Sequence, residues 1–418
     1  MNFESIREEF LKDLKKVIAI NSINGNNGAV TEKTPLGEGV YNALEAFLEI
    51  GRRFGFKAVN LDGYAGYIEC GEGEKMVGII AHVDTVDVGD GWAYPSLECT
   101  VTNEGVYGRG VADDKGPALL ALYAMRDAAK KGLLKDKKVR LILGGDEESG
   151  KWECIDRYQK TEKNPDISFS PDAEYPVVFG EKGLLKVKIS GKEASMPEDF
   201  NFEGGKVINI VPDKAKAFIN GKVLTETGIA AHGSLPELGE NAIVKLAEKI
   251  AKDYPESTFA KLISLTTKQA LGIDIEDEYG SLSLNPSILR ADKDSCALSY
   301  DIRYPITADG KTVIDAITKA SDEKGLTAEF MSHDKPLYIP LDSHLIKTLS
   351  SVYTEETGDS KGAISIGGGT YAKAFPNCAA FGVILPGEPE TAHQANEFWG
   401  FDSIKTNCRI IAKAIERL

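Results

Sequence analysis

The chain has 418 residues, of which 42% are hydrophobic and 27% charged, a composition typical of a folded globular protein. Its formal charge of −15 excludes the basic surface that nucleic-acid binding needs, and no apolar run approaches the roughly 20 residues that cross a bilayer. The charged start MNFESIREEF is not a signal peptide, and the six cysteines are scattered as in a reduced, cytoplasmic protein. We therefore expect a cytoplasmic protein that binds neither nucleic acid nor membrane.

In chain order, apolar strands alternate with helical segments at both ends of the chain. We expect strands within the segments 75–84, 137–147, 166–174 and 377–387. The first should end at His82, the second at Glu147 and the third near Asp172. We expect helices at 117–131, 152–160 and 407–418. This alternation predicts an α/β domain whose mixed sheet is covered by helices.

The middle of the chain has a different pattern. Strands such as LLKVKIS and CALSYDIRYP alternate apolar and polar residues, and helices are expected at 241–253 and 311–325. An antiparallel sheet with helices on one face fits this pattern. The length also exceeds what one core usually covers. We therefore predict a discontinuous domain of residues 1–182 and 332–418, with an α+β domain of residues 183–331 inserted into it.

Five short stretches combine histidines and acids at the ends of the predicted elements. They are IIAHVDTVD, GRGVADDKGP, LILGGDEESG, SPDAEYP and ETAHQANEF. Four of the five directly follow an apolar strand, and GRGVADDKGP precedes a helix. Because functional groups of α/β sheets collect at the carboxyl ends of strands, we expect these stretches to meet at one edge of the sheet.

Two histidines and several carboxylates form a donor set for zinc or manganese, and so many acids indicate two ions that share one carboxylate. Taken alone, each stretch has a plainer interpretation: a hydrogen-bonded histidine, a solvated Glu-Glu loop, or an Asp-Asp helix cap. Their joint occurrence favours the metal site. In an extended backbone, Glu147 and Glu148 would point in opposite directions, so one would bind metal while the other reaches the attacking water.

These five motifs, in this order along nearly the whole chain, resemble the M20 metallopeptidases, in particular the bacterial dipeptidase V branch. The resemblance implies a catalytic domain with two divalent ions, Zn²⁺ or alternatively Mn²⁺, and an inserted lid domain. It implies that Asp113 bridges the ions, with a cis peptide bond to Asp114, and that Glu147 is the general base. Asp84 would hydrogen-bond the second ring nitrogen of a metal-binding histidine. The implied metal ligands are His82, Asp113, Glu148, Asp172 and His393. Asp113 is preferred to Asp114 because it aligns with the family ligand.

The resemblance also implies substrate-binding residues in the lid and in a glycine-rich run. His232 would donate to the oxygen that becomes negative during the reaction, and Arg303, with Asn209, would bind the substrate carboxylate. Backbone N–H groups of Gly368, Gly369 and Thr370 in SIGGGTYAK would approach the same carboxylate. The alternatives are a capping histidine, a solvated arginine, and a nucleotide loop that lacks the Walker spacing. His333 and His344 match no motif and are expected to be structural.

The leading hypothesis is a metal-dependent dipeptidase acting on peptides with free amino and carboxyl ends, because Asp172 resembles the residue of dipeptidases at that position. The rival hypotheses are an M20 amidohydrolase that deacylates N-acyl amino acids and a non-catalytic metal- or peptide-binding protein. A nucleotide-binding enzyme is the least favoured. We expect a monomer rather than a homodimer.

Overall fold

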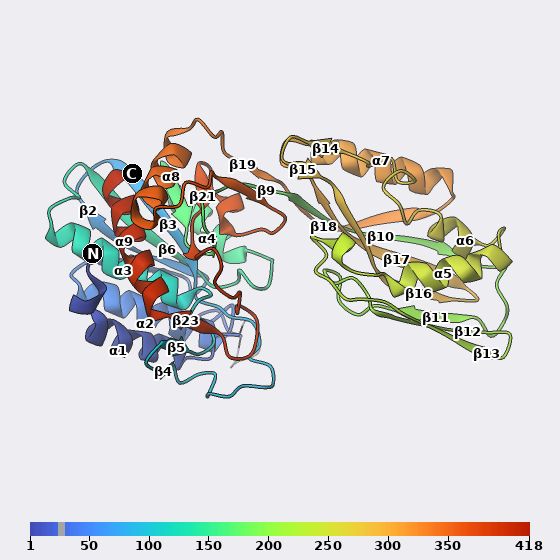
Figure 1. The fold of residues 1–418 in the computed structure, drawn as a ribbon, viewed down its shortest axis with the longest axis horizontal. Helices are drawn as coiled ribbons and strands as arrows, with labels where there is room; N and C mark the ends of the chain where they lie inside the picture. Colours follow the sequence, from blue (N-terminus) through green and yellow to red (C-terminus); the bar gives the residue numbers. More distant parts are fainter. Residues whose placement is uncertain (24–29) are drawn as a thin grey trace. The chain divides into compact units, whose positions relative to one another are not determined.

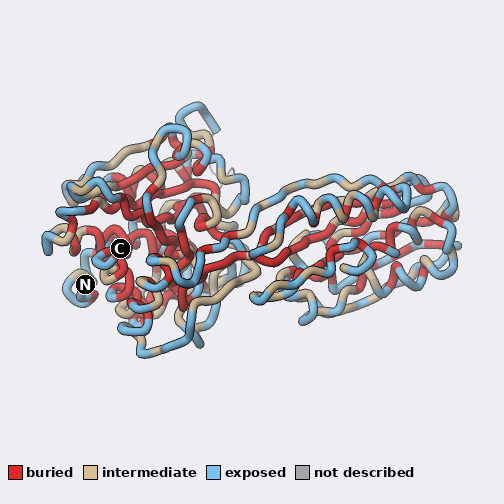
Figure 2. The backbone as a smooth tube through the Cα atoms, turned by 90° about the horizontal axis from the view of Figure 1, so that it is seen from above, coloured by how far each residue is buried: buried red, intermediate tan, exposed pale blue. Residues whose placement is uncertain are grey.

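A computed structural model describes residues 1–23 and 30–418, and the chain divides into two units. The first unit comprises Met1–Phe179, Ile339–Ile364 and Thr370–Leu418, and the second comprises Gly180–Tyr338 and Ser365–Gly369. The predicted insertion, 183–331, lies inside the second unit, which is wider and also takes in part of the glycine-rich run. In each unit the buried segments, red in Figure 2, run through the interior and exposed segments surround them.

The large sheet has the strand order β1-β2-β6-β3-β7-β21-β9-β19, with β20 beside β9. The sheet is mixed, because β3 pairs parallel with β6 and β7 while β2 pairs antiparallel with β6. Its strands are β1 Lys57–Leu61, β2 Ala65–Gly71, β3 Lys75–His82, β6 Lys137–Gly144, β7 Ile167–Ser170, β9 Val178–Glu181, β19 Leu337–Tyr338, β20 Ile364–Ile366 and β21 Cys378–Ala380. Nearly every residue of β3, β6 and β7 is buried, which requires cover on both faces.

Helices of the first unit supply that cover (Figure 1). They are α1 Arg7–Ile18, α2 Glu38–Arg53, α3 Lys115–Lys130, α4 Glu153–Thr161, α8 His344–Thr357 and α9 Phe401–Arg417. Helix α3 contacts β3 and β6, α2 contacts β1 and β2, and α9 packs on α3 and α8. Small ladders at the rim are formed by β4 Thr100–Val101, β5 Gly105–Tyr107 and β23 Phe398–Gly400, and by β8 Ala173–Glu174 with β22 Val383–Ile384. The predicted α/β class is confirmed.

The second unit is built on an antiparallel sheet of order β13-β12-β11-β16-β17-β10-β18. Its strands are β10 Gly183–Lys192, β11 Asn201–Gly204, β12 Lys214–Ile219, β13 Lys222–Thr227, β16 Ser283–Asp292, β17 Ser295–Tyr304 and β18 Thr327–Asp334, with a short hairpin of β14 Glu276–Asp277 and β15 Gly280–Ser281. Helices α5 Ala242–Asp253, α6 Thr258–Ile263 and α7 Gly310–Glu323 pack against it.

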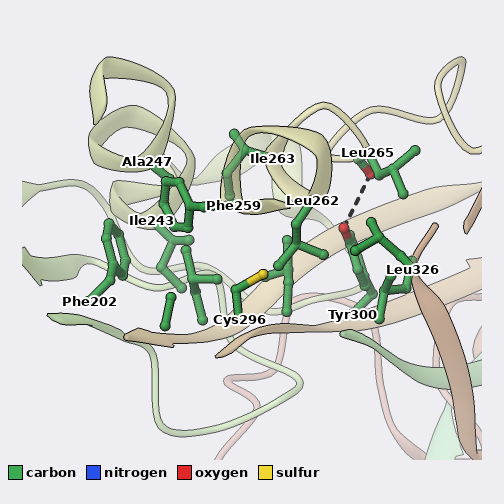
Figure 3. Packing of buried hydrophobic residues seen from close by; sticks show 14 of the residues in the cluster. Phe202, Ile243, Ala247, Phe259, Leu262, Ile263, Leu265, Cys296, Tyr300 and Leu326 are labelled. Carbon is green, nitrogen blue, oxygen red and sulfur yellow. Dashed lines mark hydrogen bonds between the residues drawn. The ribbon is translucent and has the colours of Figure 1, made fainter. Parts of the chain in front are cut away.

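Alternating burial along these strands explains the core of the second unit. Residues of β10 alternate buried and half-buried, so one face of the strand carries the apolar side chains. Figure 3 shows Phe259 and Leu262 of α6 and Ile243 of α5 packed over this face. The hydroxyl of Tyr300 donates to the carbonyl oxygen of Leu265 at 3.3 Å, which satisfies the polar end of a buried ring.

Three predicted strands end earlier than expected. Strand β6 stops at Gly144 and β7 at Ser170, and the strand predicted at 377–387 divides into β21 and β22. The division falls at Gly382, whose φ of 85° is incompatible with an extended strand. All six cysteines lie within the described residues and are thiols rather than disulfides, five of them buried. Among the described residues, every helix is too short or too polar to span a bilayer.

Candidate metal centre

The first histidine of the predicted site closes a central strand. His82 is the last residue of β3 and is 1% exposed, with its ring directed at the acids of neighbouring loops. Its Nδ1 donates to the carbonyl oxygen of Asp84 at 3.0 Å, whereas the Asp84 carboxylate is 3.5 Å away. The carbonyl is thus the nearer acceptor, and the Asp84 carboxylate that we expected in this role is the second. A proton held on Nδ1 leaves Nε2 as the atom that can bind a cation.

One carboxylate contacts both histidines. The Oδ1 of Asp113 lies 2.9 Å from Nε2 of His82, and its Oδ2 lies 3.0 Å from Nε2 of His393. The peptide bond between Asp113 and Asp114 is cis, as expected. Asp114 is fully buried and accepts the backbone N–H of His82 at 3.1 Å, so it braces the end of β3. This geometry supports Asp113, rather than Asp114, as the shared ligand.

Two groups of potential ligands form around this carboxylate. Within the described residues they are His82, Asp113 and Asp172, and Asp113, Glu148 and His393, and in each group the ligand atoms lie within 4.8 Å of one another. Each group offers one imidazole nitrogen and two carboxylate oxygens, the donors that zinc and manganese accept. Ligand atoms about 2 Å from a common ion are separated by about 3–4 Å, so the donor set fits two divalent ions.

The two glutamates that follow β6, Glu147 and Glu148, lie in a turn and not in an extended backbone. Residues 147–150 form a turn two residues after β6, and the Gly150 N–H donates to the carbonyl oxygen of Glu147 at 2.9 Å. The expectation that Glu147 and Glu148 alternate as in a strand is therefore wrong. The cause is Asp146, whose buried carboxylate accepts the N–H groups at the start of α4 and ends the strand early.

Electrostatics in this cluster are those of crowded acids. Burial, followed by the charges of Asp172 and Glu148, raises the pKa of Glu147 well above its usual value, with His82 opposing the shift. Burial beside Asp113 raises the pKa of Asp172 to about 7. Hydrogen bonds with Asp113 and Glu148 raise the pKa of His393 to about 11. Burial opposes ionisation of Asp113, but hydrogen bonds from His393 and His82 outweigh it and lower its pKa. Excess negative charge in one place is what bound cations would neutralise.

The sequence reasoning missed one carboxylate beside this site. Glu397 is fully buried, pairs with Arg109 at 2.8 Å, and accepts the backbone N–H of Asp113 at 3.2 Å. Arg109 lies in the motif GRGVADDKGP and Glu397 in the motif ETAHQANEF. An arginine in one motif and a glutamate in another are residue types that can form a buried ion pair, and this was the signal in the sequence.

The predicted residues of the second unit gather among themselves. Arg303 is 5% exposed, and it donates to the carbonyl oxygen of Gly367 at 2.6 Å and to Asp301 at 3.1 Å, so it is not a solvated arginine. His232 is exposed and forms a hydrogen bond with the hydroxyl of Ser234 at 2.7 Å. The carbonyl of Asn209 accepts the N–H of Gly233 at 2.7 Å, one residue beyond His232.

The glycine-rich run divides between the units. Gly368 and Gly369 belong to the second unit with the carbonyl that Arg303 binds, and Thr370 belongs to the first, where its side chain caps a 3₁₀ turn, Tyr371–Ala374. Of the remaining histidines, His333 forms a hydrogen bond with the Tyr304 hydroxyl at 2.7 Å, and His344 opens α8.

Comparison with known families decides what this site belongs to. The model of peptidase family M20/M25/M40 matches residues 78–417, which include all five potential ligands. The chain belongs to this peptidase family. The sequence resemblance to M20 metallopeptidases is thereby confirmed.

Similar proteins cover nearly the whole chain. The YtjP protein of Bacillus subtilis (strain 168) is 34% identical over 99% of this chain and 97% of its own. The Beta-Ala-Xaa dipeptidase of Lactobacillus delbrueckii subsp. lactis is 33% identical, again over 99% of this chain and 97% of its own. The crystal structure of an aminoacylhistidine dipeptidase from Vibrio alginolyticus matches with a TM-score of 0.66 over 98% of this chain and 96% of that one. At 14% identity, that structure shows the shared fold alone.

Proposed function

We propose that this M20 peptidase is a metal-dependent dipeptidase that hydrolyses short peptides with free amino and carboxyl ends. The observation that carries the proposal is Asp113, whose two oxygens each face a different histidine at about 3 Å. The relationship to a Beta-Ala-Xaa dipeptidase over nearly the full length of both chains supports the substrate class.

His82, Asp172, Glu148 and His393 would hold two ions, with Asp113 between them. When bound, such ions polarise a carbonyl group and lower the pKa of water. We assign Zn²⁺ to the pair, with Mn²⁺ as the alternative, because imidazole and carboxylate suit both.

Glu147 is the proposed general base. Its backbone N–H is held at 3.2 Å by the Asp84 carboxylate, and its side chain interacts electrostatically with His82 and Asp172 beside both ligand groups. It removes a proton from the attacking water and gives it to the leaving amine as the peptide bond breaks.

The second unit supplies the proposed substrate contacts. We assign residues 183–331 as the lid domain, His232 as donor to the oxygen that becomes negative, and Arg303 with Asn209 as the carboxylate-binding residues. Backbone N–H groups of the run 368–370 would complete that end. Burial of Arg303 against Asp301 supports this assignment, because a pre-oriented guanidinium presents its remaining N–H groups in a fixed direction.

Hydrolysis of a dipeptide panel tests the proposal. Protein stripped with a chelator and reloaded with zinc or manganese is assayed on α-dipeptides, β-alanyl dipeptides and their N-acetylated forms. Free dipeptides should be cleaved only after reloading. Preference for N-acetylated substrates would instead identify a deacylase, and tight peptide binding without turnover would identify a non-catalytic homologue. Light scattering and cell fractionation test two further assignments, a monomer and a cytoplasmic location.

A further inference from the structure

Outside both ligand groups, one buried ion pair lies among the loops that carry the ligands. Glu397 is 0% and Arg109 2% exposed, and Nη1 of the arginine lies 2.8 Å from Oε2 of the glutamate. A buried carboxylate is costly unless its oxygens are satisfied. Here they also accept three backbone N–H groups, from Gly110, Ala112 and Asp113, at 2.9–3.2 Å.

These bonds connect three of the segments that carry potential ligands. The three N–H groups belong to the segment that ends in Asp113. Glu397 itself closes the loop that carries His393, four residues earlier in the sequence. The Nη2 of Arg109 donates to the carbonyl oxygen of Asp87 at 3.2 Å, in the loop that follows His82. Its guanidinium also lies over the ring of Trp92, 5.4 Å from the centroid.

We propose that Glu397, held by Arg109, is a positioning residue that fixes the spacing of Asp113 and His393 and thereby sets the affinity of the metal centre. The inference rests on the proposed metal-dependent function and adds to it a residue that touches neither substrate nor ion. Glutamine at this position would keep the shape but replace an accepting oxygen with an N–H₂ group facing backbone donors, and it would leave Arg109 buried without its counter-charge.

The first unit offers a control. Buried Arg140 and half-buried Glu69 form another arginine–glutamate pair, at 2.6 Å, on neighbouring strands β6 and β2. This pair contacts Tyr158 and Glu162 rather than the ligand-bearing loops. Glu69→Gln therefore removes one of the two carboxylates that Arg140 binds in the same unit, and it should cost some stability without changing metal binding.

The experiment compares zinc binding by wild-type protein, Glu397→Gln, Arg109→Lys and Glu69→Gln. Each protein is stripped of metal, its melting temperature is recorded, and zinc affinity and stoichiometry are measured by competition with a chromogenic chelator. We expect Glu397→Gln and Arg109→Lys to bind zinc 10- to 100-fold more weakly, the range typical of residues that orient metal ligands. Glu69→Gln should keep wild-type affinity while its metal-free melting temperature falls.

Two results would overturn the inference. One is wild-type zinc affinity in either folded variant of the Glu397–Arg109 pair, and the other is an equal loss of affinity in Glu69→Gln. If Glu397→Gln does not fold, Arg109→Lys, which keeps both charges but not the planar fork, decides the matter. Failure of the wild-type protein to bind zinc would contradict the proposed function itself, so the two failures are distinguishable.

Discussion

The carboxylate of Asp84 shows how one residue can order two others. Its two oxygens accept the backbone N–H groups of Glu147 and Glu148, at 3.2 and 3.1 Å. Because one carboxylate binds two adjacent N–H groups, it fixes the backbone of the turn and with it the direction in which each glutamate side chain points. Glu148 then meets His393, at 3.1 Å, while Glu147 stays outside both ligand groups found among the described residues. Neighbours in sequence thus acquire different roles from one anchoring group.

Replacing Glu147 with glutamine should lower kcat strongly and leave metal binding unchanged. Glutamine keeps the size of the side chain but cannot accept a proton, so kcat should fall roughly 10²- to 10⁴-fold, the usual contribution of general acid–base catalysis. The measurement is steady-state hydrolysis of a cleaved dipeptide, together with the zinc content per chain, which should be unchanged.

The same substitution at Glu153, an exposed residue six positions further on, serves as the control and should leave kcat near that of the wild-type protein. Retention of more than a tenth of the activity in Glu147→Gln would show that another group moves the proton.

At the scale of elements, the loops of the second unit are held by close backbone contact. A Cβ at Gly233 would lie 2.4 Å from the Oδ2 of Asp301, the same oxygen that binds Arg303. It would also lie 3.0 Å from the carbonyl oxygen of Asn209. The loop that carries His232 and the strand that carries Arg303 can therefore approach each other only with glycine at this position.

Gly233→Ala should consequently disturb substrate binding and leave the metal site intact. A methyl group pushes Asp301 away from Arg303, so the guanidinium loses its orientation and KM for dipeptides should rise at least about 10-fold. Zinc content should not change, since all five clustered ligands belong to the first unit. Gly362→Ala, where a methyl group meets open space, is the control. An unaltered KM in Gly233→Ala would contradict the assignment of Arg303.

The aromatic core of the second unit allows a test of stability. Phe259 is 0% exposed, with its ring centroid 5.2 Å from that of Phe200 and 5.8 Å from that of Phe202. Phe259→Ala should lower the free energy of unfolding by about 3–5 kcal/mol, as measured by urea denaturation. Phe218→Ala, at a ring that is 39% exposed, should cost less than about 1 kcal/mol. Equal costs would mean that α6 does not anchor this core.

At the scale of the whole molecule, periodicity predicted the arrangement of the elements better than their ends. The apolar run of β3 predicted a sheet buried on both faces, and the alternating pattern of β17 predicted a sheet buried on one face. Both predictions were possible because the number of buried faces determines which positions along a strand are apolar. The end of β6 was misplaced, because a side-chain bond from Asp146 to α4 decides it. Glu397 was missed for a similar reason: its partner Arg109 lies far away along the chain. Arg109 and Glu397 each lie inside a motif, but only the three-dimensional structure shows that they pair.

The proposed metal ligands also come from segments on either side of the second unit. Asp172 precedes the second unit in sequence and His393 follows it, yet both approach Asp113 in the first unit. Ions bound here would cross-link segments that the insertion separates along the chain. Binding to the folded state alone stabilises it by mass action, so the first unit should unfold at a higher temperature with zinc than without it.

Metal binding should also release protons. In the metal-free protein, hydrogen bonds with Asp113 and Glu148 raise the pKa of His393 to about 11, and burial raises that of Asp172 to about 7. At pH 7 the imidazole is therefore protonated, and the carboxyl of Asp172 is about half protonated. A cation can bind these groups only after the protons leave. Because the raised pKa values favour the protonated, metal-free form, zinc affinity should increase as the pH rises from about 6 to about 8.

Calorimetric titration of stripped protein with zinc, in buffers of equal pH but different ionisation enthalpy, measures this release directly. The observed heat should change with the buffer in proportion to at least one proton released per chain. In His393→Ala, which lacks the most basic of these groups, the release should fall by about one proton while some zinc still binds through His82, Asp113 and Asp172. Heats that do not depend on the buffer would show that the ligands are already deprotonated, and that crowding of these acids and imidazoles does not control the affinity of the site.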